Sequence, residues 1–315
     1  MDISSVCIVG GSGFVGRALA EQLAPRGIGV RVITRNRPRA MPLVVLPTVE
    51  IVVADPHDTG SLARAFENMD AVVNLVGILH EGRRQTFESC HVELPARVVE
   101  ACHSAGVQHL VHMSSLGASD SGPSAYLRSK AAGEAAVRRT AGILPFTIFR
   151  PSVIYGAGDS FLNRFATFAR WFPVIPMPAA AARVQPIWVE DVARCMAGCL
   201  GDARHFGRAW ELCGPQAISL ADLQRFVART LGRDPAIVAL PGAVASLQAF
   251  VLEHLPGKLL TRDNLRSLEA DATCSQPFPE IFGFKPSPLE AVVPEYLAGT
   301  AARARYARYR QGVGR

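Results

Sequence analysis

Three residues near the middle of the chain have the types and the spacing for acid–base chemistry. Tyr126 and Lys130 stand four residues apart in the segment Tyr-Leu-Arg-Ser-Lys, and Ser115 precedes them. In a helix, positions i and i+4 share one face, so this spacing places the phenol and the ammonium one turn apart. A neighbouring ammonium favours tyrosinate, and we expect Lys130 to lower the pKa of Tyr126. Ser115 would orient a substrate oxygen. An exposed helical pair without chemistry is the alternative.

A glycine-rich loop near the N-terminus predicts a phosphate site. Gly10, Gly13 and Gly16 follow the apolar run Val6–Val9 and open a helical pattern. Gly10 would allow a tight turn, Gly13 would let the backbone approach a diphosphate, and Gly16 would let helix and strand pack closely. Backbone N–H groups at the start of a helix bind phosphate, so we expect a dinucleotide here, also contacted by Ser12, Phe14 and Val15.

The end of the second predicted strand indicates which dinucleotide binds. An acid there would hold the ribose 2′-hydroxyl of NAD, but the chain has Thr34-Arg-Asn-Arg37. A guanidinium matches a 2′-phosphate in charge and geometry, which favours NADP(H) over NAD(H). Arg35 is the first candidate and Arg37 the reserve. The alternative, surface arginines in a loop, applies more to Arg37.

Other cofactor contacts are expected at the ends of the following strands. Asp55 could accept the adenine amino group, and Val76 and Gly77 would let the nucleotide lie against the backbone. Ser114 closes the fifth strand, and Lys130 could also hold the ribose hydroxyls. We expect no metal site.

Short apolar runs alternate with helical patterns over residues 1–150. The expected strands are 6–9, 29–34, 50–53, 71–76, 110–113 and 146–149, and the expected helices are 14–23, 61–68, 94–104 and 124–139. Strands that are apolar on both faces and alternate with helices form a parallel sheet between helical layers. The predicted fold is therefore α/β, a doubly wound, Rossmann-like parallel sheet.

The second half of the chain predicts a smaller, mostly helical C-terminal substrate domain. We assign residues 1–150 and about 184–202 to the nucleotide-binding domain, and residues 151–183 and 203–300 to the smaller one. Within the latter, residues 219–231 should form a capped helix. Residues 243–255 place Val244, Leu247 and Phe250 largely along one side of another helix. Such a stripe is more often core than membrane surface.

Composition excludes wholesale disorder and a nucleic-acid-binding surface. Of 315 residues, 49% are hydrophobic and 19% charged, with a net charge of +6. Five Arg and no acid lie in the basic tail 301–315, which leaves 28 basic and 27 acidic residues elsewhere. The tail could meet an acidic lipid or protein surface, or be a solvated terminus.

The seven Cys form no CxxC pair, so we expect buried thiols in a reducing compartment rather than a disulfide framework. No signal peptide or spanning segment is evident, which predicts a soluble cytoplasmic protein able to rest at the inner face of the membrane.

Taken in order, the glycine loop, Ser114-Ser115 and Tyr126-x-x-x-Lys130 resemble the extended or atypical branch of the short-chain dehydrogenase/reductase superfamily. The segment Arg150-Pro-Ser-Val-Ile-Tyr-Gly156 is similar to the one that closes over the nicotinamide side, which implies cofactor contacts at Pro151 and Val153. Ile187-Trp-Val-Glu-Asp-Val-Ala193 continues the resemblance.

A narrower resemblance covers most of the chain. The glycine loop and the segments 91–95, 112–115, 126–130, 158–165 and 255–258 are similar to bacterial relatives of the nucleotide-binding accessory subunit of respiratory complex I. That family implies a tightly held NADPH and includes relatives tied to ubiquinone biosynthesis. Two departures concern catalysis: His91 stands nearest to the Asn of active enzymes, and only ten residues separate Ser115 from Tyr126. We interpret His91 as a packed or partly exposed residue at a helix start rather than a proton donor.

Three functions are compatible with these observations. The first is an NADP(H)-binding protein associated with complex I or ubiquinone metabolism, with a structural nucleotide and a respiratory-complex or membrane-surface partner for its C-terminal region. The second is an active NADPH-dependent reductase, epimerase or dehydratase acting on a small carbonyl or quinone-related substrate through Ser115, Tyr126 and Lys130. The third is a regulator that senses NADP(H). The same fold hosts all three.

Overall fold

A computed structural model describes residues 1–82, 85–255, 258 and 260–297. Its larger unit is a parallel sheet of seven strands in the order β11-β6-β5-β4-β1-β2-β3. The strands are β1 (Ser5–Val9), β2 (Gly29–Thr34), β3 (Val49–Val53), β4 (Ala71–Asn74), β5 (His109–Met113), β6 (Phe146–Pro151) and β11 (Arg208–Leu212). This is the Rossmann-like α/β fold that the sequence predicts.

Alternating residues of each central strand face two separate helical layers. On β1, Val6 and Ile8 pack toward α1 (Phe14–Leu23) and α7 (Val189–Cys199). Cys7 and Val9 face α3 (Thr59–Phe66), α4 (Leu94–Ser104) and α5 (Ala125–Arg138). The short helix α2 (Arg37–Ala40) connects β2 to β3. Both faces of the sheet are therefore buried, as a parallel sheet requires.

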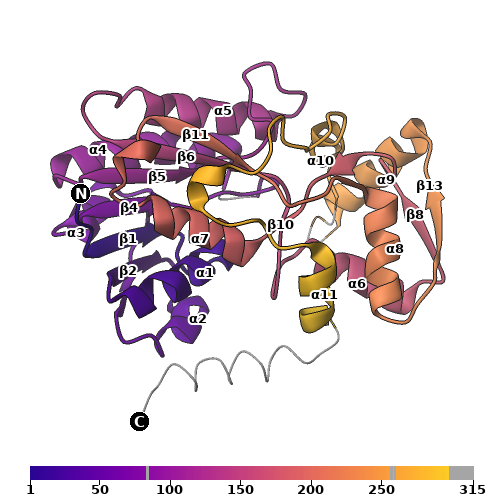
Figure 1. The fold of residues 1–315 in the computed structure, drawn as a ribbon. Helices are drawn as coiled ribbons and strands as arrows, with labels where there is room; N and C mark the ends of the chain where they lie inside the picture. The colour runs from indigo at the N-terminus through magenta and orange to yellow at the C-terminus, as the bar shows by residue number, and fades with distance from the viewer. Residues whose placement is uncertain (83–84, 256–257, 259, 298–315) are drawn as a thin grey trace, which may run out of the picture.

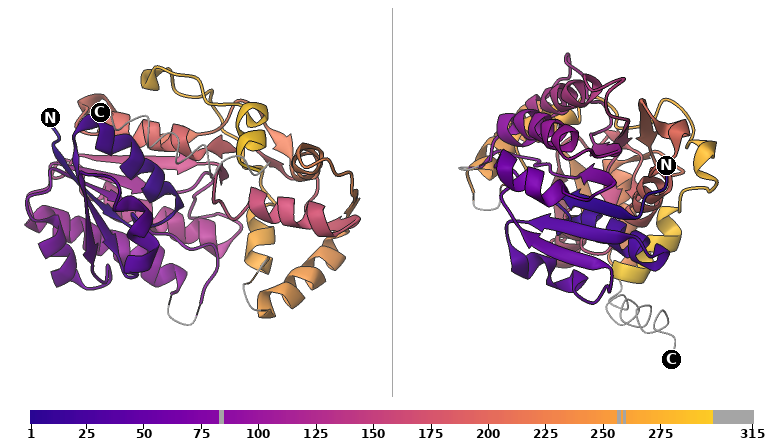
Figure 2. Two further views of the ribbon diagram at one scale, coloured as in Figure 1. Left: turned by 90° about the horizontal axis from the view of Figure 1, so that it is seen from below. Right: turned by 90° about the vertical axis from the view of Figure 1, so that its left-hand side faces the viewer.

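The parallel strands all run from the side of the N-terminus toward the smaller unit, so their carboxyl ends face that unit. In Figure 1 the N-terminus lies at the far side of the sheet, and the smaller unit lies beyond the opposite end, an arrangement also seen in Figure 2. Ligands of such sheets bind at the carboxyl ends of the strands. A site is therefore expected at this edge of the sheet, on the side of the smaller unit.

The smaller unit consists of helices with three short strand pairs. Its helices are α6 (Leu162–Trp171), α8 (Leu220–Thr230), α9 (Gly242–His254), α10 (Arg262–Ser267) and α11 (Leu289–Leu297). The strand pairs are β7 (Ile154–Tyr155) with β10 (Ile187–Trp188), β9 (Arg183–Val184) with β12 (Ile218–Ser219), and β8 (Val174–Met177) with β13 (Ala236–Ala239). A separate apolar cluster from α6, α8 and α11 forms its core.

Two expectations about this part of the chain are wrong. Residues 208–212 form the edge strand β11 of the main sheet, although we expected residues 203–300 to belong to the smaller domain. Because β11 pairs with β6 in parallel, these five residues belong to the sheet unit and not to the smaller domain. The apolar side of α9 is not core either, because Val244, Leu247 and Phe250 are exposed and only Ala245 and Ala249 are buried.

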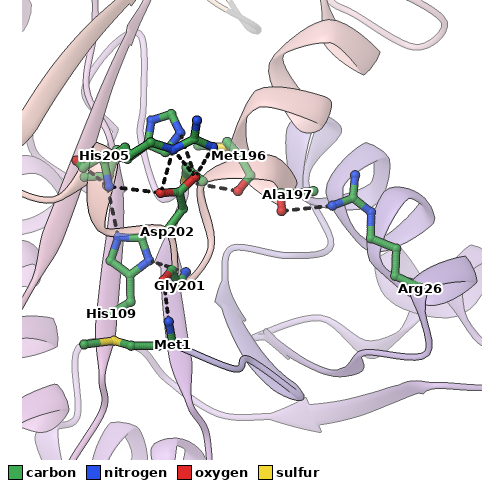
Figure 3. Close-up of polar contacts among 11 residues, drawn as sticks. Met1, Arg26, His109, Met196, Ala197, Gly201, Asp202 and His205 are labelled. Atoms are coloured by element: carbon green, nitrogen blue, oxygen red, sulfur yellow. Dashed lines mark hydrogen bonds and ion pairs between the residues drawn. The ribbon is translucent and has the colours of Figure 1, made fainter. Parts of the chain in front are cut away.

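The turn that follows α7 fixes the N-terminus and β5 to the same point (Figure 3). The N-terminal ammonium of Met1 donates to the carbonyl of Gly201 at 2.8 Å, and the amide of Gly201 donates to Nδ1 of His109 at 3.3 Å. Nε2 of His109 lies 3.0 Å from the hydroxyl of Thr147, which itself donates to the carbonyl of His205. These bonds hold His109 in its neutral form with the proton on Nε2.

The cysteines differ in part from expectation. Five are buried free thiols, as predicted, namely Cys7, Cys90, Cys102, Cys195 and Cys199. Cys213 and Cys274 form a disulfide, which the spacing of the cysteines did not predict. The fold brings their Cα atoms within 6.0 Å although 61 positions separate them.

Within the described part of the chain, no helix combines the length and the apolar content that crossing a bilayer requires. The predicted basic tail, residues 301–315, lies outside the described residues.

Candidate functional site

The glycine loop joins β1 to α1 at the carboxyl edge of the sheet. Gly10 adopts a left-handed conformation with φ of 83°, and a Cβ there would lie 3.2 Å from a methyl group of Val76. A Cβ at Gly16 would lie 2.5 Å from Cα of Gly11, which no larger residue allows. Gly10 thus makes the tight turn and Gly16 the close packing that the sequence predicts.

The first turn of α1 lacks a protein cap. Gly13 is the N-cap residue, and among the described residues no side chain bonds to the amides that follow it, those of Phe14, Val15 and Gly16. A Cβ at Gly13 would lie 3.1 Å from the carbonyl oxygen of Gly10, so glycine leaves this backbone accessible. Unpaired N–H groups and the positive end of the helix dipole attract phosphate. These residues therefore fit the diphosphate of a dinucleotide.

Arg35 follows β2 directly beside this loop. The hydroxyls of Ser12 and Thr34 lie 2.9 Å apart and join the loop to the end of β2. Arg35 is exposed, and within residues 1–82 and the other described ranges its guanidinium has no side-chain partner. Arg37, two residues further along the chain, begins α2. A free guanidinium next to a phosphate loop is suited to a second anionic group.

The other residues expected to contact the cofactor lie at successive strand ends. Asp55 is exposed after β3, and its Oδ1 accepts from the amide of His57 at 3.1 Å, leaving Oδ2 without a bond from the described residues. Beyond β4, the amide of Val76 donates to Oδ1 of Asn74 at 3.2 Å. The Cβ position of Gly77 lies 3.8 Å from Nζ of Lys130. The loop after β4 therefore runs from the phosphate loop to Lys130.

Tyr126 lies in the first turn of α5, which Ser124 caps by accepting a hydrogen bond from the amide of Leu127. Its ring packs edge-on against Phe87 and His91, with centroids 6.0 and 5.6 Å apart. Burial raises the pKa of Tyr126, and a hydrogen bond with Ser115 only partly opposes this shift. The phenol therefore keeps its proton at neutral pH. The expected lowering of its pKa by Lys130 is wrong.

Lys130 is directed into the sheet rather than into solvent. Its Nζ donates to the carbonyl of Met113 at the end of β5, at 2.6 Å. Burial lowers the pKa of Lys130 to about 8, although Glu134 one turn away favours the charged form. The ammonium is thus held beside Gly77 and the end of β5, where a ribose hydroxyl could reach it.

Glu134 is the buried counter-charge behind Lys130. Burial opposes its ionisation, but the hydrogen bonds and the positive charge of Arg150 outweigh that effect, so the pKa of Glu134 lies below its usual value. Nε and Nη2 of Arg150 donate to its two oxygens at 2.7 and 2.6 Å. This paired geometry anchors α5 to β6. Ser114 is buried beside Glu134.

Pro151 and Val153 lie where β6 enters the smaller unit. Pro151 is buried and its carbonyl accepts from the amide of Leu116, which sets the segment beside Ser115. Val153 is half-buried, and its carbonyl accepts from the amide of Ile187.

His91 was not predicted to be functional, yet it joins two parts of the site. It lies in a π-helical turn, Glu88–Glu93, and is buried, in agreement with its interpretation as a packed residue. Burial, and then the charge of Lys130, lower the pKa of His91 to about 3. Its position where active enzymes carry Asn was the only signal in the sequence.

Among the described residues, no group of three or more His, Cys, Asp or Glu side chains is arranged to hold a metal ion. The expected absence of a metal site stays a prediction.

Comparison with known proteins identifies the family. Residues 10–170 match the model of a family described as NAD(P)H-binding. The mitochondrial NADH dehydrogenase [ubiquinone] 1 alpha subcomplex subunit 9 of Arabidopsis thaliana is 30% identical over 285 residues, which cover 85% of this chain and 70% of that protein. A ceramide reductase of Caulobacter vibrioides is 31% identical, over 75% of this chain and 73% of its own.

A solved structure shares the fold. The NADPH complex of an NADPH-dependent quinone oxidoreductase from Escherichia coli superposes with a TM-score of 0.74 at 19% identity, covering 93% of this chain and all of the other. With its family match extending over the glycine loop, Tyr126 and Lys130, the chain belongs to the NAD(P)H-binding family that includes the alpha subcomplex subunit 9 relatives.

Proposed function

We propose that this chain binds NADP(H) at the carboxyl edge of the sheet, as a protein associated with respiratory complex I or ubiquinone metabolism. The uncapped first turn of α1 above Gly10 and Gly13 is the observation that carries this proposal. Arg35, exposed and unpaired among the described residues, supports NADP(H) over NAD(H). The relatives named as NADH dehydrogenase subunits support the respiratory association. In this proposal the nucleotide is structural.

The second candidate function is NADPH-dependent reduction of a small carbonyl or quinone-related compound. The hydrogen bond between Ser115 and Tyr126 favours it. A bound NADPH would supply the hydride. Tyr126 keeps its proton at neutral pH and would deliver it to the substrate oxygen, which Ser115 orients. Lys130 would hold the ribose and oppose the charge left on the phenol. Epimerase or dehydratase chemistry would use the same three residues.

We also propose a cytoplasmic location, peripheral to the inner face of the membrane, with the C-terminal region docked on a respiratory complex. The exposed apolar side of α9 supports this, since four large side chains of the helix and that of its C-cap residue Leu255 are between 46% and 64% exposed. The four are Val244, Leu247, Phe250 and Val251. Exposed apolar patches of this kind mark interaction sites. Leu247→Glu should reduce co-purification with complex I, and Arg208→Glu is the control. Binding of the parent chain to phospholipid vesicles alone would assign the patch to lipid instead.

Nucleotide extraction tests the first proposal. Denatured protein should release NADP(H), and titration should give tighter binding of NADPH than of NADH. Gly13→Ala places a Cβ against the loop and should weaken NADPH binding at least tenfold. Gly198→Ala is the matched control, because a Cβ there meets nothing within 4 Å. Equal affinities of the two variants would exclude the loop as the binding site.

Tyr126→Phe separates the two candidate functions. If the chain is a reductase, this variant should lose NADPH oxidation with a short-chain benzoquinone by at least a hundredfold while still binding NADPH. If the nucleotide is structural, Tyr126→Phe should support growth as the parent chain does, with nucleotide still bound.

A further inference from the structure

Helix α10 of the smaller unit contacts the first turn of α5, the helix that carries Tyr126. Oδ1 of Asp263 accepts from the amide of Ala125 at 2.8 Å, and Oδ2 accepts from the amide of Tyr126 itself at 3.0 Å. The hydroxyl of Ser267 donates to the N-cap hydroxyl of Ser124 at 2.8 Å. One carboxylate, more than 130 positions away in the chain, therefore caps the two amides that Ser124 leaves open.

We propose that Asp263 is a positioning residue, which fixes the backbone of Tyr126 and so makes α10 of the smaller unit part of the reductase site. The inference rests on the proton-donor role proposed for Tyr126. It differs from an ordinary helix cap in its origin, because the capping carboxylate comes from the other unit of the fold. Ser115, the partner of the Tyr126 hydroxyl, belongs to the sheet unit.

The chemistry of the contact requires a carboxylate. The two amides of Ala125 and Tyr126 point out of the first turn and need two acceptors. An ionised carboxylate offers both oxygens and also complements the positive end of the helix dipole. An amide offers one oxygen, and its NH₂ group would face a second donor. Asp263→Asn is therefore nearly isosteric but can satisfy only one amide.

The same helix also holds the loop that follows β4. Nδ2 of Asn264 donates to the carbonyl of Leu79 at 3.0 Å. Lys258, which precedes α10 in the chain, adds a second contact, because its Nζ donates to the carbonyl of Glu81 at 2.6 Å. This loop begins at Val76 and Gly77, beside Lys130. Neighbouring residues of α10 thus restrain two elements of the site, the start of α5 and the loop after β4.

Helix α10 is fastened in turn to the rest of the smaller unit. Its N-terminus has a capping box between Thr261 and Asn264. Nε of Arg262 donates to Glu253 on α9 at 2.9 Å, and the guanidinium lies over the ring of Phe250. A displacement of the smaller unit would therefore be transmitted through Asp263 to the backbone of Tyr126.

Two measurements on the full chain test the role of Asp263 without requiring turnover. The first is hydrogen exchange at the amides of Ala125 and Tyr126, which should become roughly 5- to 30-fold faster in Asp263→Asn, as expected for the loss of a helix cap. The second is the ¹⁹F NMR signal of 3-fluorotyrosine at Tyr126. The chain has five tyrosines, and the signal is assigned by its loss in Tyr126→Phe. It should shift or broaden in Asp263→Asn.

Asp222→Asn is the matched control, since Asp222 is an exposed carboxylate in the first turn of α8 and touches no part of α5. It should leave both signals unchanged, while Asp263→Glu, which keeps two acceptor oxygens, should restore them in part. If Asp263→Asn does not fold, Ser267→Ala, which removes the contact with Ser124, should speed the same two amides. Unchanged signals in Asp263→Asn, or equal changes in Asp222→Asn, would overturn the proposal.

The outcomes separate this inference from the proposed reductase function. Loss of NADPH oxidation in Tyr126→Phe with unaltered exchange in Asp263→Asn would retain the reductase and reject the positioning role. Altered exchange in Asp263→Asn with full NADPH oxidation in Tyr126→Phe would reject the proton-donor role, and with it Asp263 as part of a reductase site.

Discussion

His91 accepts a hydrogen bond from the backbone amide of Ile78, with 3.0 Å between Nε2 and the amide nitrogen. Its Nδ1 lies 2.8 Å from the hydroxyl of Ser129, which donates to the carbonyl of Tyr126. The neutral imidazole with its proton on Nδ1 satisfies all of these bonds. His91 thus links the loop after β4 to the first turn of α5, the two elements that α10 also restrains.

Replacement of His91 by Ala should weaken NADPH binding about tenfold. The change leaves the amide of Ile78 without its acceptor and frees the loop that carries Gly77. Equilibrium titration with NADPH measures the effect, and His103→Ala, an exposed position on α4, is the control. His91→Asn should keep more of the affinity, because its side-chain oxygen can still accept a hydrogen bond. Identical NADPH affinities of His91→Ala and the parent chain would show that this link does not support the site.

The contrast between the predicted and the unpredicted site residues follows from the range of their interactions. Gly10, Gly13 and Gly16 act through the local backbone, and Tyr126 and Lys130 through one helix, so spacing along the chain reveals them. His91 and Asp263 act through partners 13 and more than 130 positions away. Their residue types carry no signal of those contacts, which only the folded chain creates.

The same distinction applies to the fold. The bounds of α1, β2 and α4 are as predicted, because the apolar periodicity that defines them lies within the elements themselves. The place of β11 in the main sheet depends on its pairing with β6 across some 60 positions, which a pattern of five residues does not encode. The apolar side of α9 is likewise exposed because no other described element packs over it, which the pattern within α9 does not reveal.

Arg35→Glu should lower the affinity for NADPH by roughly 10- to 100-fold and change the affinity for NADH much less. The substitution replaces a cation with an anion at the position proposed for the 2′-phosphate, and hydrogen bonds to charged groups contribute about 1.5–3 kcal/mol. Arg37→Glu tests the reserve candidate. Arg233→Glu, exposed in the smaller unit, controls for the change in net charge. A loss of NADPH affinity in Arg37→Glu alone would transfer the role to Arg37, and no loss in either variant would remove the basis for NADP(H).

Acid should destabilise the fold through His109. Burial, and then His205 and the N-terminal ammonium, lower the pKa of His109 to about 4, and its Nδ1 already accepts the amide of Gly201. Between pH 6.5 and 4 the unfolded chain therefore binds a proton that the folded chain rejects, so the free energy of unfolding falls as pH falls. From pH 7.5 to 5 we expect His109 to account for a loss of about 2 kcal/mol.

Urea unfolding at pH 7.5 and pH 5 measures this contribution. His109→Gln should be less stable than the parent chain at pH 7.5 but should lose less stability on acidification. His103→Gln, which changes an exposed histidine, should retain the acid sensitivity of the parent chain. If His109→Gln and the parent chain lose the same free energy between the two pH values, another group is responsible.

The disulfide between Cys213 and Cys274 should stabilise the fold against unfolding. It joins the residue after β11 to a segment whose Ala272 carbonyl accepts a hydrogen bond from Ser152, beside Pro151 and Val153. Closing a loop of this length contributes about 4 kcal/mol by restricting the unfolded chain. Reductant should therefore lower the midpoint of thermal unfolding, on the order of 5 °C.

Two measurements test the disulfide: titration of thiols in denaturant detects the bond, and thermal unfolding measures its effect on stability. The oxidised chain should show five reactive thiols and the reduced chain seven. The double variant Cys213→Ser/Cys274→Ser should unfold at the lower midpoint with or without reductant, while Cys102→Ser should keep the response because its buried thiol is unpaired. Since the bonded segment borders the proposed nicotinamide side, saturating NADPH should recover part of the midpoint lost on reduction. An equal midpoint for the oxidised chain and the double variant would mean that the bond adds no stability.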